Sequence, residues 1–288
     1  MIYATLSIML IGTHVSISGG YLNAIEEAKR LGIDTMQIFT KNQRFWREKE
    51  VKEEEGKLFR EEMKKAGIKQ AFSHAIYLIS LGSEKEEVIE KSLLSLASEL
   101  IRCETLGLSH TVVHPGNAGS RTKKEAIKTI GERVKMVLDS TVSLKSKILL
   151  ENTAGQGSSI GGDLKVLCAL VNYIDSPRVG ICFDTCHAYA AGYDIRTEKG
   201  IIDTLKLIHE DAGKMKLQCF HMNDSKGSLG SHVDRHAHVG KGELGLEAFR
   251  HIVNAYPKIP KVLETSKEDD ADVKNLTILR SLRKKKAV

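Results

Sequence analysis

The sequence has few of the residues that interrupt or cross-link a fold. Its 288 residues include only four prolines, one tryptophan and five cysteines. The scarcity of proline, with 41% hydrophobic residues and no low-complexity tract, argues against a long disordered linker. No apolar run reaches the roughly 18 residues that a membrane-spanning helix needs. We therefore expect one soluble domain over residues 1–288, in which about 281–288 form a basic tail.

The five cysteines show no disulfide or metal-binding pattern. They are odd in number, contain no CxxC pair and lie in apolar runs: Cys103, Cys168, Cys182, Cys186 and Cys219. This pattern is typical of reduced, buried thiols in a cytoplasmic protein. The apolar start MIYATLSIMLIG lacks a basic region and a cleavage site, so we interpret it as a buried strand. A net charge of +6 permits a polyanionic partner without requiring one.

Short apolar runs alternate with longer segments of helical period along the whole chain. The eight candidate strands are LSIMLIG, TMQIF, KQAFSH, HTVVH, KILLEN, VGICFD, LQCFHM and PKVLET. Eight strand-then-helix units in a chain of this length predict a single (β/α)₈ TIM barrel of the α/β class. An open doubly wound sheet is the alternative, but GTHVSISGG lacks the glycine spacing of its dinucleotide turn.

Chemistry in such barrels lies at the carboxyl ends of the strands. His14 ends the first predicted strand and Asn42 follows the second. The six later strands end in residues of the types that bind metals: His74, His114, Glu151, Asp184, His221 and Glu264. Nearby spacing adds three more candidates: His187, Asp234 and His236. Nine such side chains exceed the needs of one ion, so they predict a cluster of two or three zinc ions, with manganese or iron as substitutes.

Seven motifs occur in register with a known family. They are TKNQRFW, FSHAIYLISLG, VVHPGN, LLENTAGQG, FDTCHAYAAGYD, HMNDSKGSLGSHVDRHAHVGKG and VLET. In this order they closely resemble endonuclease IV, the zinc-dependent family of apurinic/apyrimidinic endonucleases, from about Ile11 to the last helix. The resemblance implies three zinc ions. The first would be held by His74, His114 and Glu151, the second by Glu151, Asp184, His221 and Glu264, and the third by His187, Asp234 and His236.

The resemblance also implies a reaction and a partner. The reaction is hydrolysis of the phosphodiester 5′ to an abasic site in duplex DNA, with Glu151 as the catalytic bridging carboxylate, and trimming of blocked 3′ ends. Arg44, Tyr77 and Leu78 match the positions that fill the gap in the base stack. The chain departs from the family pattern at Ile76, Ser80, His232 and Ser266, none of which is a proposed metal ligand.

Two alternatives remain open. Related barrels that isomerise or epimerise sugars bind one or two metals at their strand ends, but they leave TKNQRFW unexplained. A non-catalytic protein that binds damaged DNA would also carry these motifs. We expect a monomer that binds DNA and no membrane.

Overall fold

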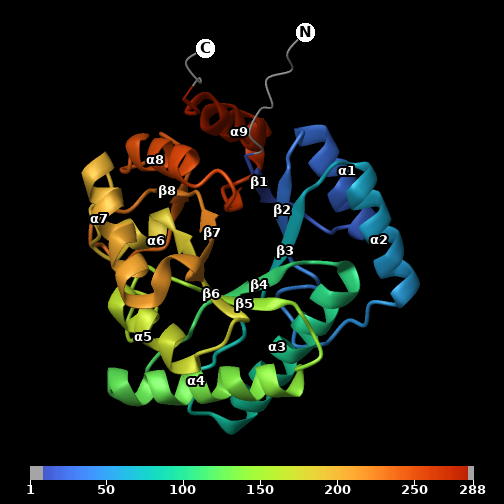
Figure 1. Cartoon of the computed structure of the whole chain (residues 1–288), viewed down its shortest axis with the longest axis vertical. Coiled ribbons are helices and arrows are strands. Elements are labelled where there is room, and N and C mark those ends of the chain that lie inside the picture. Colours follow the sequence, from blue (N-terminus) through green and yellow to red (C-terminus); the bar gives the residue numbers. More distant parts are fainter. Residues whose placement is uncertain (1–8, 285–288) are drawn as a thin grey trace.

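The computed structural model describes residues 9–284, in which eight parallel strands close into a barrel (Figure 1). The strands are β1 (Ile11–His14), β2 (Thr35–Ile38), β3 (Gln70–His74), β4 (His110–Val113), β5 (Lys147–Glu151), β6 (Val179–Asp184), β7 (Leu217–His221) and β10 (Lys261–Leu263). Each strand pairs with its neighbour in the chain, and β10 closes the ring by pairing with both β1 and β7. The prediction of a TIM barrel is confirmed.

Helices cover the outside of the barrel (Figure 1). They are α1 (Tyr21–Leu31), α2 (Glu53–Lys65), α3 (Glu86–Leu106), α4 (Lys123–Ser140), α5 (Leu164–Ile174), α6 (Thr185–Ala190), α7 (Glu198–Ile208), α8 (Glu247–Ala255) and α9 (Ala271–Ser281). Glycines end several of them, and Gly32 and Gly107 adopt the left-handed conformation in which glycine has no steric cost. A short antiparallel hairpin, β8 (Asp224–Ser225) with β9 (His236–Ala237), follows β7.

The segment GIIDTLKLIHEDAGKMK, residues 200–216, has a helical pattern in the sequence but is not one helix in the structure. The helix continues only as a π turn over His209–Gly213 and a 3₁₀ turn over Lys214–Lys216. Gly213 has φ 92°, which is incompatible with a right-handed helix, so the regular hydrogen bonding stops there.

The core lies between the barrel and its helices, and a smaller apolar cluster fills the barrel interior. Six side chains form that inner cluster: Phe72, Val112, Leu149, Cys182, Cys219 and Val262. All five cysteines are buried and free, as the sequence predicted. Residues 6–8 of the first predicted strand and residues 285–288 of the predicted tail lie outside the described part of the chain. None of the described helices is long and apolar enough to cross a membrane.

Candidate metal centre

The barrel brings the strand-end residues to one place. His74, Glu151, Asp184 and His221 are the last residues of β3, β5, β6 and β7. His114 and Glu264 come one residue after β4 and β10, and the remaining candidates lie on α6 and the β8–β9 hairpin. Because all eight strands are parallel in a closed barrel, their carboxyl ends form one ring. The nine predicted side chains therefore converge at one end of the barrel, in three adjoining groups.

Glu151 is the centre of this arrangement. Its Oε2 atom lies 3.2 Å from Nε2 of His74 and 3.2 Å from Nε2 of His114. Its Oε1 atom lies 2.8 Å from Nδ1 of His221 and 3.3 Å from Nδ1 of His187. One carboxylate thus faces four imidazoles while its side chain is only 1% exposed. Its two oxygens thus face different pairs of imidazoles.

The other two groups adjoin it. His221 Nδ1 lies 3.1 Å from Glu264 Oε2 and 3.9 Å from Asp184 Oδ2. Asp234 lies between two imidazoles, with Oδ2 3.2 Å from His187 Nε2 and Oδ1 3.4 Å from His236 Nε2. Each group therefore combines at least one imidazole with at least one carboxylate, which is the ligand chemistry that zinc accepts.

The hydrogen bonds of two imidazoles leave one ring nitrogen of each for a metal. His74 Nδ1 donates to the carbonyl of Ala75 at 2.7 Å, and His187 Nδ1 donates to the carbonyl of Asn152 at 2.9 Å. In each ring this fixes Nε2 as the nitrogen with the free lone pair. The buried Nε2 atoms of His187 and His236 have no hydrogen-bond partner among the described residues. Orphaned buried acceptors beside carboxylates fit a cation.

Two amide side chains that the sequence analysis missed hold the carboxylates in place. Gln37 accepts from His221 Nε2 at 2.8 Å and donates to Glu264 Oε1 at 2.6 Å. Asn223 donates to Asp184 Oδ2 at 2.6 Å and accepts from the backbone N–H of Glu264 at 2.8 Å. A signal for Gln37 was present in the sequence, since it is a polar residue inside the apolar run TMQIF.

The imidazoles and carboxylates of the cluster shift one another's pKa values. Burial favours a raised pKa for Glu151, but the charge of His221 and the hydrogen bonds from His114 and His187 outweigh it and hold that pKa well below its usual value. Burial likewise favours a lowered pKa for His221, but the charges of Glu264 and Glu151 raise that pKa well above its usual value. Glu151 is thus held in its charged form, which is the form that binds a cation.

Cysteines also approach the cluster but are poorer ligands. Cys182 and Cys219 come near His221, and Cys186 comes near Asp184. Burial raises the pKa of the Cys186 thiol to about 12 and that of the Cys182 thiol well above its usual value. Metals bind the thiolate, so these protonated thiols are disfavoured.

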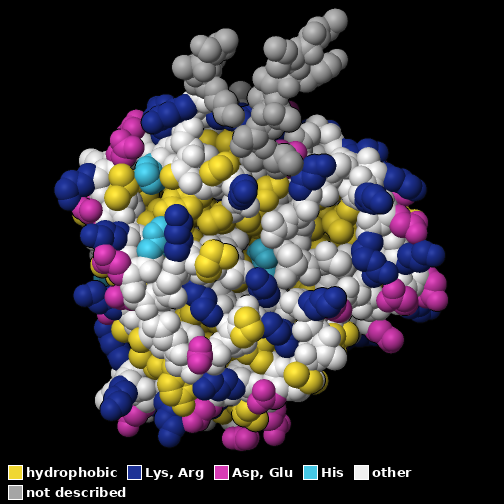
Figure 2. Space-filling view, viewed as in Figure 1, with side chains coloured by type: hydrophobic (Ala, Val, Ile, Leu, Met, Phe, Trp, Pro, Cys, Tyr) yellow, Lys and Arg dark blue, Asp and Glu magenta, His cyan; other side chains and the backbone are white. Residues whose placement is uncertain are grey.

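The predicted DNA-contacting residues lie around the mouth of the site. The Tyr77 side chain is 60% exposed, and its ring centre lies 5.3 Å from that of His74 and 5.9 Å from that of His114. Leu78 beside it is half-buried, and Arg44 is exposed in the loop after β2. A cavity of about 440 Å³ opens over the cluster and is lined by Tyr77 and His114. Lysine and arginine side chains are spread over the face seen in Figure 2 rather than gathered in one patch.

Other polar residues singled out in the sequence have different positions. His14 lies beside the cluster, with Nδ1 2.9 Å from Gln37 Nε2. Asn42 accepts from the backbone N–H of Arg44 at 2.9 Å and so shapes the loop after β2. His232 has a left-handed backbone and donates from Nδ1 to the carbonyl of Ala154 at 2.9 Å, outside the three groups.

Imidazoles and carboxylates cluster at the strand ends of this TIM barrel. These features define the class of TIM barrels with a metal site at the active-site face. A family model described as "Xylose isomerase-like TIM barrel" matches residues 25–284. The protein named "Probable endonuclease 4" of Geobacter sp. (strain M21) is 42% identical over 278 residues, which cover 95% of this chain and 98% of that protein. The chain belongs to the endonuclease IV family of nucleases, which confirms the resemblance.

Solved structures agree with this assignment. Endonuclease IV from Thermus thermophilus is 35% identical and superposes with a TM-score of 0.85 over 94% of this chain and 98% of that chain. A D-tagatose 3-epimerase-like protein is 18% identical, with a TM-score of 0.75 over 95% of this chain and 97% of that chain. At that identity the likeness shows the shared barrel alone.

Proposed function

We propose that this protein hydrolyses duplex DNA on the 5′ side of abasic sites, leaving a 3′-hydroxyl and a 5′-deoxyribose phosphate, and that it also trims blocked 3′ ends. The observation that carries the proposal is the buried Glu151 carboxylate, shared between imidazoles of neighbouring groups. The proteins similar to this chain that are named endonuclease 4 and endonuclease IV support DNA as the substrate.

The donor set fits three zinc ions. His74, His114 and Glu151 would hold one ion; Glu151, Asp184, His221 and Glu264 a second; and His187, Asp234 and His236 a third. The high share of imidazole favours zinc over magnesium or calcium, with manganese or iron as substitutes. When bound, such ions supply a hydroxide nucleophile near neutral pH and stabilise the charge on the phosphate oxygens.

The chain's own residues orient these groups. Glu151 would act as the bridging catalytic carboxylate, and its burial excludes the water that would otherwise weaken its electrostatic interactions. Gln37 and Asn223 fix the carboxyl groups of Glu264 and Asp184 through the hydrogen bonds described above. This leaves the ligands little freedom to rotate before substrate arrives.

The exposed residues at the mouth would recognise the lesion. The Tyr77 ring and the Leu78 side chain would occupy the space of the missing base, and Arg44 would reach the sugar-phosphate backbone. Extruding the abasic sugar costs less than extruding a paired nucleotide, because no base has to be unstacked. Recognition would therefore depend on wedging side chains rather than on reading bases.

A cleavage assay tests the proposal. Purified, zinc-loaded protein is incubated with a labelled duplex that carries a single tetrahydrofuran abasic analogue, and with the same duplex lacking it. We expect one cut immediately 5′ to the analogue, lost in the presence of a chelator and restored by zinc. Intact analogue duplex after incubation with fully metallated protein would contradict the proposal, as would equal cutting of both duplexes.

A further inference from the structure

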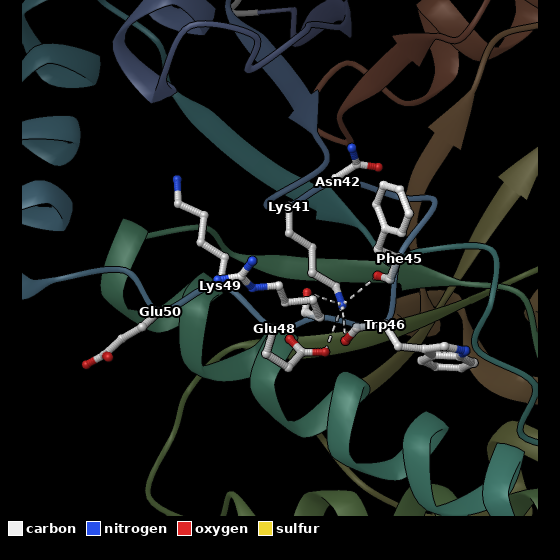
Figure 3. A pocket seen from close by; sticks show the side chains of 8 residues that line it. Lys41, Asn42, Phe45, Trp46, Glu48, Lys49 and Glu50 are labelled. Carbon is white, nitrogen blue, oxygen red and sulfur yellow. Dashed lines mark hydrogen bonds and ion pairs between the residues drawn. The ribbon is translucent and has the colours of Figure 1, made fainter.

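The loop that carries Arg44 is held by a buried lysine. We define the Arg44 loop as residues 42–50, which lie between β2 and α2 without regular structure. The Lys41 side chain is only 2% exposed, and its Nζ atom lies 2.8 Å from Glu48 Oε1. The same ammonium donates to the carbonyls of Phe45 at 3.3 Å and Trp46 at 3.2 Å (Figure 3). One cation thus contacts the middle of the loop, from Phe45 to Glu48.

A second cation ties the loop to helix α3. The Arg102 side chain is 3% exposed and pairs with Glu48 Oε2 at 2.5 Å and with Glu99 Oε2 at 2.6 Å. It also donates from Nη1 to the carbonyl of Lys49 at 3.4 Å and from Nε to Thr40 Oγ1 at 2.8 Å. Glu48 therefore pairs with two buried cations, Lys41 beside the start of the loop and Arg102 on α3.

Apolar packing alone does not explain the shape of the loop. Its residues surround an open hollow of about 780 Å³, along which Lys41 reaches toward the loop backbone (Figure 3). The Phe45 side chain is 60% exposed, so it does not anchor the loop by burial. Burying charges is costly unless each is paired, and here the ion pairs and carbonyl contacts supply that pairing. The loop conformation therefore depends on these charged contacts together with Trp46, which is half-buried and packs against the core.

The exposed side chains of the Arg44 loop indicate the function of its conformation. Arg44 and Arg47 are exposed on either side of Phe45 and Trp46, and the described residues place no carboxylate in an ion pair with either guanidinium. A cavity of about 410 Å³ runs from Arg44 to His14, which lies beside the metal cluster. Basic and aromatic residues interleaved in this way suit a nucleic-acid strand.

We infer that Lys41, Glu48 and Arg102 are positioning residues that hold the Arg44 loop in its DNA-binding conformation before DNA arrives. The inference rests on the proposed function, because it concerns how that substrate is held. A loop ordered in advance loses less conformational entropy on binding, so the same contacts give higher affinity. The network should therefore act on the binding of DNA and leave the hydrolytic step and the metal content unchanged.

The first test replaces the buried ammonium. For Lys41→Met we expect the KM for the abasic-analogue duplex to rise about tenfold, the scale of losing a charge-assisted hydrogen bond, with kcat within about twofold of the unmodified protein. Bound zinc per chain should not change. The matched control is Lys52→Met, which removes the same charge from an exposed lysine just beyond the loop. An equal rise in KM for Lys52→Met would overturn the inference, because net charge would then explain both.

A second readout does not depend on cleavage. Trp46 is the only tryptophan of the chain and lies in the loop, so its fluorescence reports on the loop alone. In DNA-free protein, Lys41→Met should make Trp46 emission shift to the red and become more accessible to acrylamide quenching. Duplex binding followed by anisotropy in the presence of chelator should weaken in parallel. Unchanged quenching and unchanged duplex affinity would refute a positioning role.

A milder variant covers the case in which Lys41→Met fails to fold. Glu48→Gln keeps the shape of the side chain and removes its charge from both ion pairs. We expect the same rise in KM and the same change in Trp46 quenching, smaller in size, in a protein that still folds, with a thermal unfolding midpoint lowered because two buried cations lose a charged partner. A fall in kcat at unchanged KM in either variant would contradict the inference. If the unmodified protein does not cut at all, the proposed function fails, while Trp46 quenching and duplex binding still decide the role of the network.

Discussion

Gln37 on β2 and His221 at the end of β7 lie 184 residues apart in the chain, and the Gln37 Oε1 atom accepts from His221 Nε2 at 2.8 Å. This bond leaves His221 Nδ1 to face Glu151 and Glu264. The same amide donates to Glu264 Oε1. One neutral side chain thus fixes both the ring orientation of an imidazole and the rotamer of a carboxylate.

Replacing this amide by an apolar side chain tests its importance. Gln37→Leu keeps a similar volume but removes both hydrogen bonds, and loss of such contacts to metal ligands typically costs about 10- to 100-fold in metal affinity or activity. We expect that loss in zinc titrations and in cleavage of the abasic-analogue duplex. Gln70→Leu, at the first residue of β3, is the control. Equal zinc affinity in Gln37→Leu and the unmodified protein would show that the bond is dispensable.

Removing the shared carboxylate should affect more than one ion. Glu151→Ala leaves the imidazoles of His74, His114 and His221 without their common partner. We expect cleavage to fall by at least about a hundredfold and the zinc content, measured by elemental analysis, to fall from about three ions per chain. Glu132→Ala removes an exposed carboxylate on α4 and should change neither quantity. Retention of both zinc and activity in Glu151→Ala would exclude a bridging role.

Tyr77 allows a substitution that separates DNA binding from stability. Because its side chain is 60% exposed, Tyr77→Ala should leave the thermal unfolding midpoint and the zinc content unchanged. Stacking of an aromatic ring on a base is worth about 1–3 kcal/mol, so we expect affinity for the abasic-analogue duplex to fall by about tenfold or more. Tyr77→Phe should retain most of it. Tyr173→Ala, on α5, serves as the control, and a similar loss there would point to a nonspecific effect.

Lys261 links stability to pH at the start of β10. It is fully buried, and burial lowers its pKa from 10.5 to about 7. The folded protein therefore binds fewer protons at this site than the unfolded chain between pH 7 and 10.5, so stability rises with pH across that window. The unfolding free energy of Lys261→Met minus that of the unmodified protein should therefore fall by about 1.4 kcal/mol for each pH unit in this window. A pH-independent difference between the two proteins would refute this.

The candidate metal ligands could be predicted from the sequence, because residue types that bind metals stand directly after β-branched or apolar runs. In a parallel barrel this position fixes which end of the molecule a side chain occupies, so convergence at one end followed without knowledge of any distance. The grouping into three ion sites came from the family resemblance. The structure adds the distances that make Glu151 common to two of those groups.

The supporting residues were harder to predict for a physical reason. The roles of Gln37 and Asn223 depend on which strands become neighbours and in what register, and neither is encoded in local composition. The buried state of Lys41 was equally hidden, since a lysine beside a loop normally lies in solvent. The break at Gly213 came from one backbone angle, which hydrophobic periodicity does not report.

Closure of the barrel has a consequence for how the protein folds. The cluster draws its side chains from β3 through β10, so no fragment of the chain can assemble it before the last strand docks. Contacts of such long sequence separation form late and slowly, because the loop entropy must be lost before they contribute. Ions that bind only the closed ring would then draw the final equilibrium toward the native state by mass action. If the proposed metal centre forms, metal availability during synthesis would thereby influence the yield of folded enzyme as well as its activity.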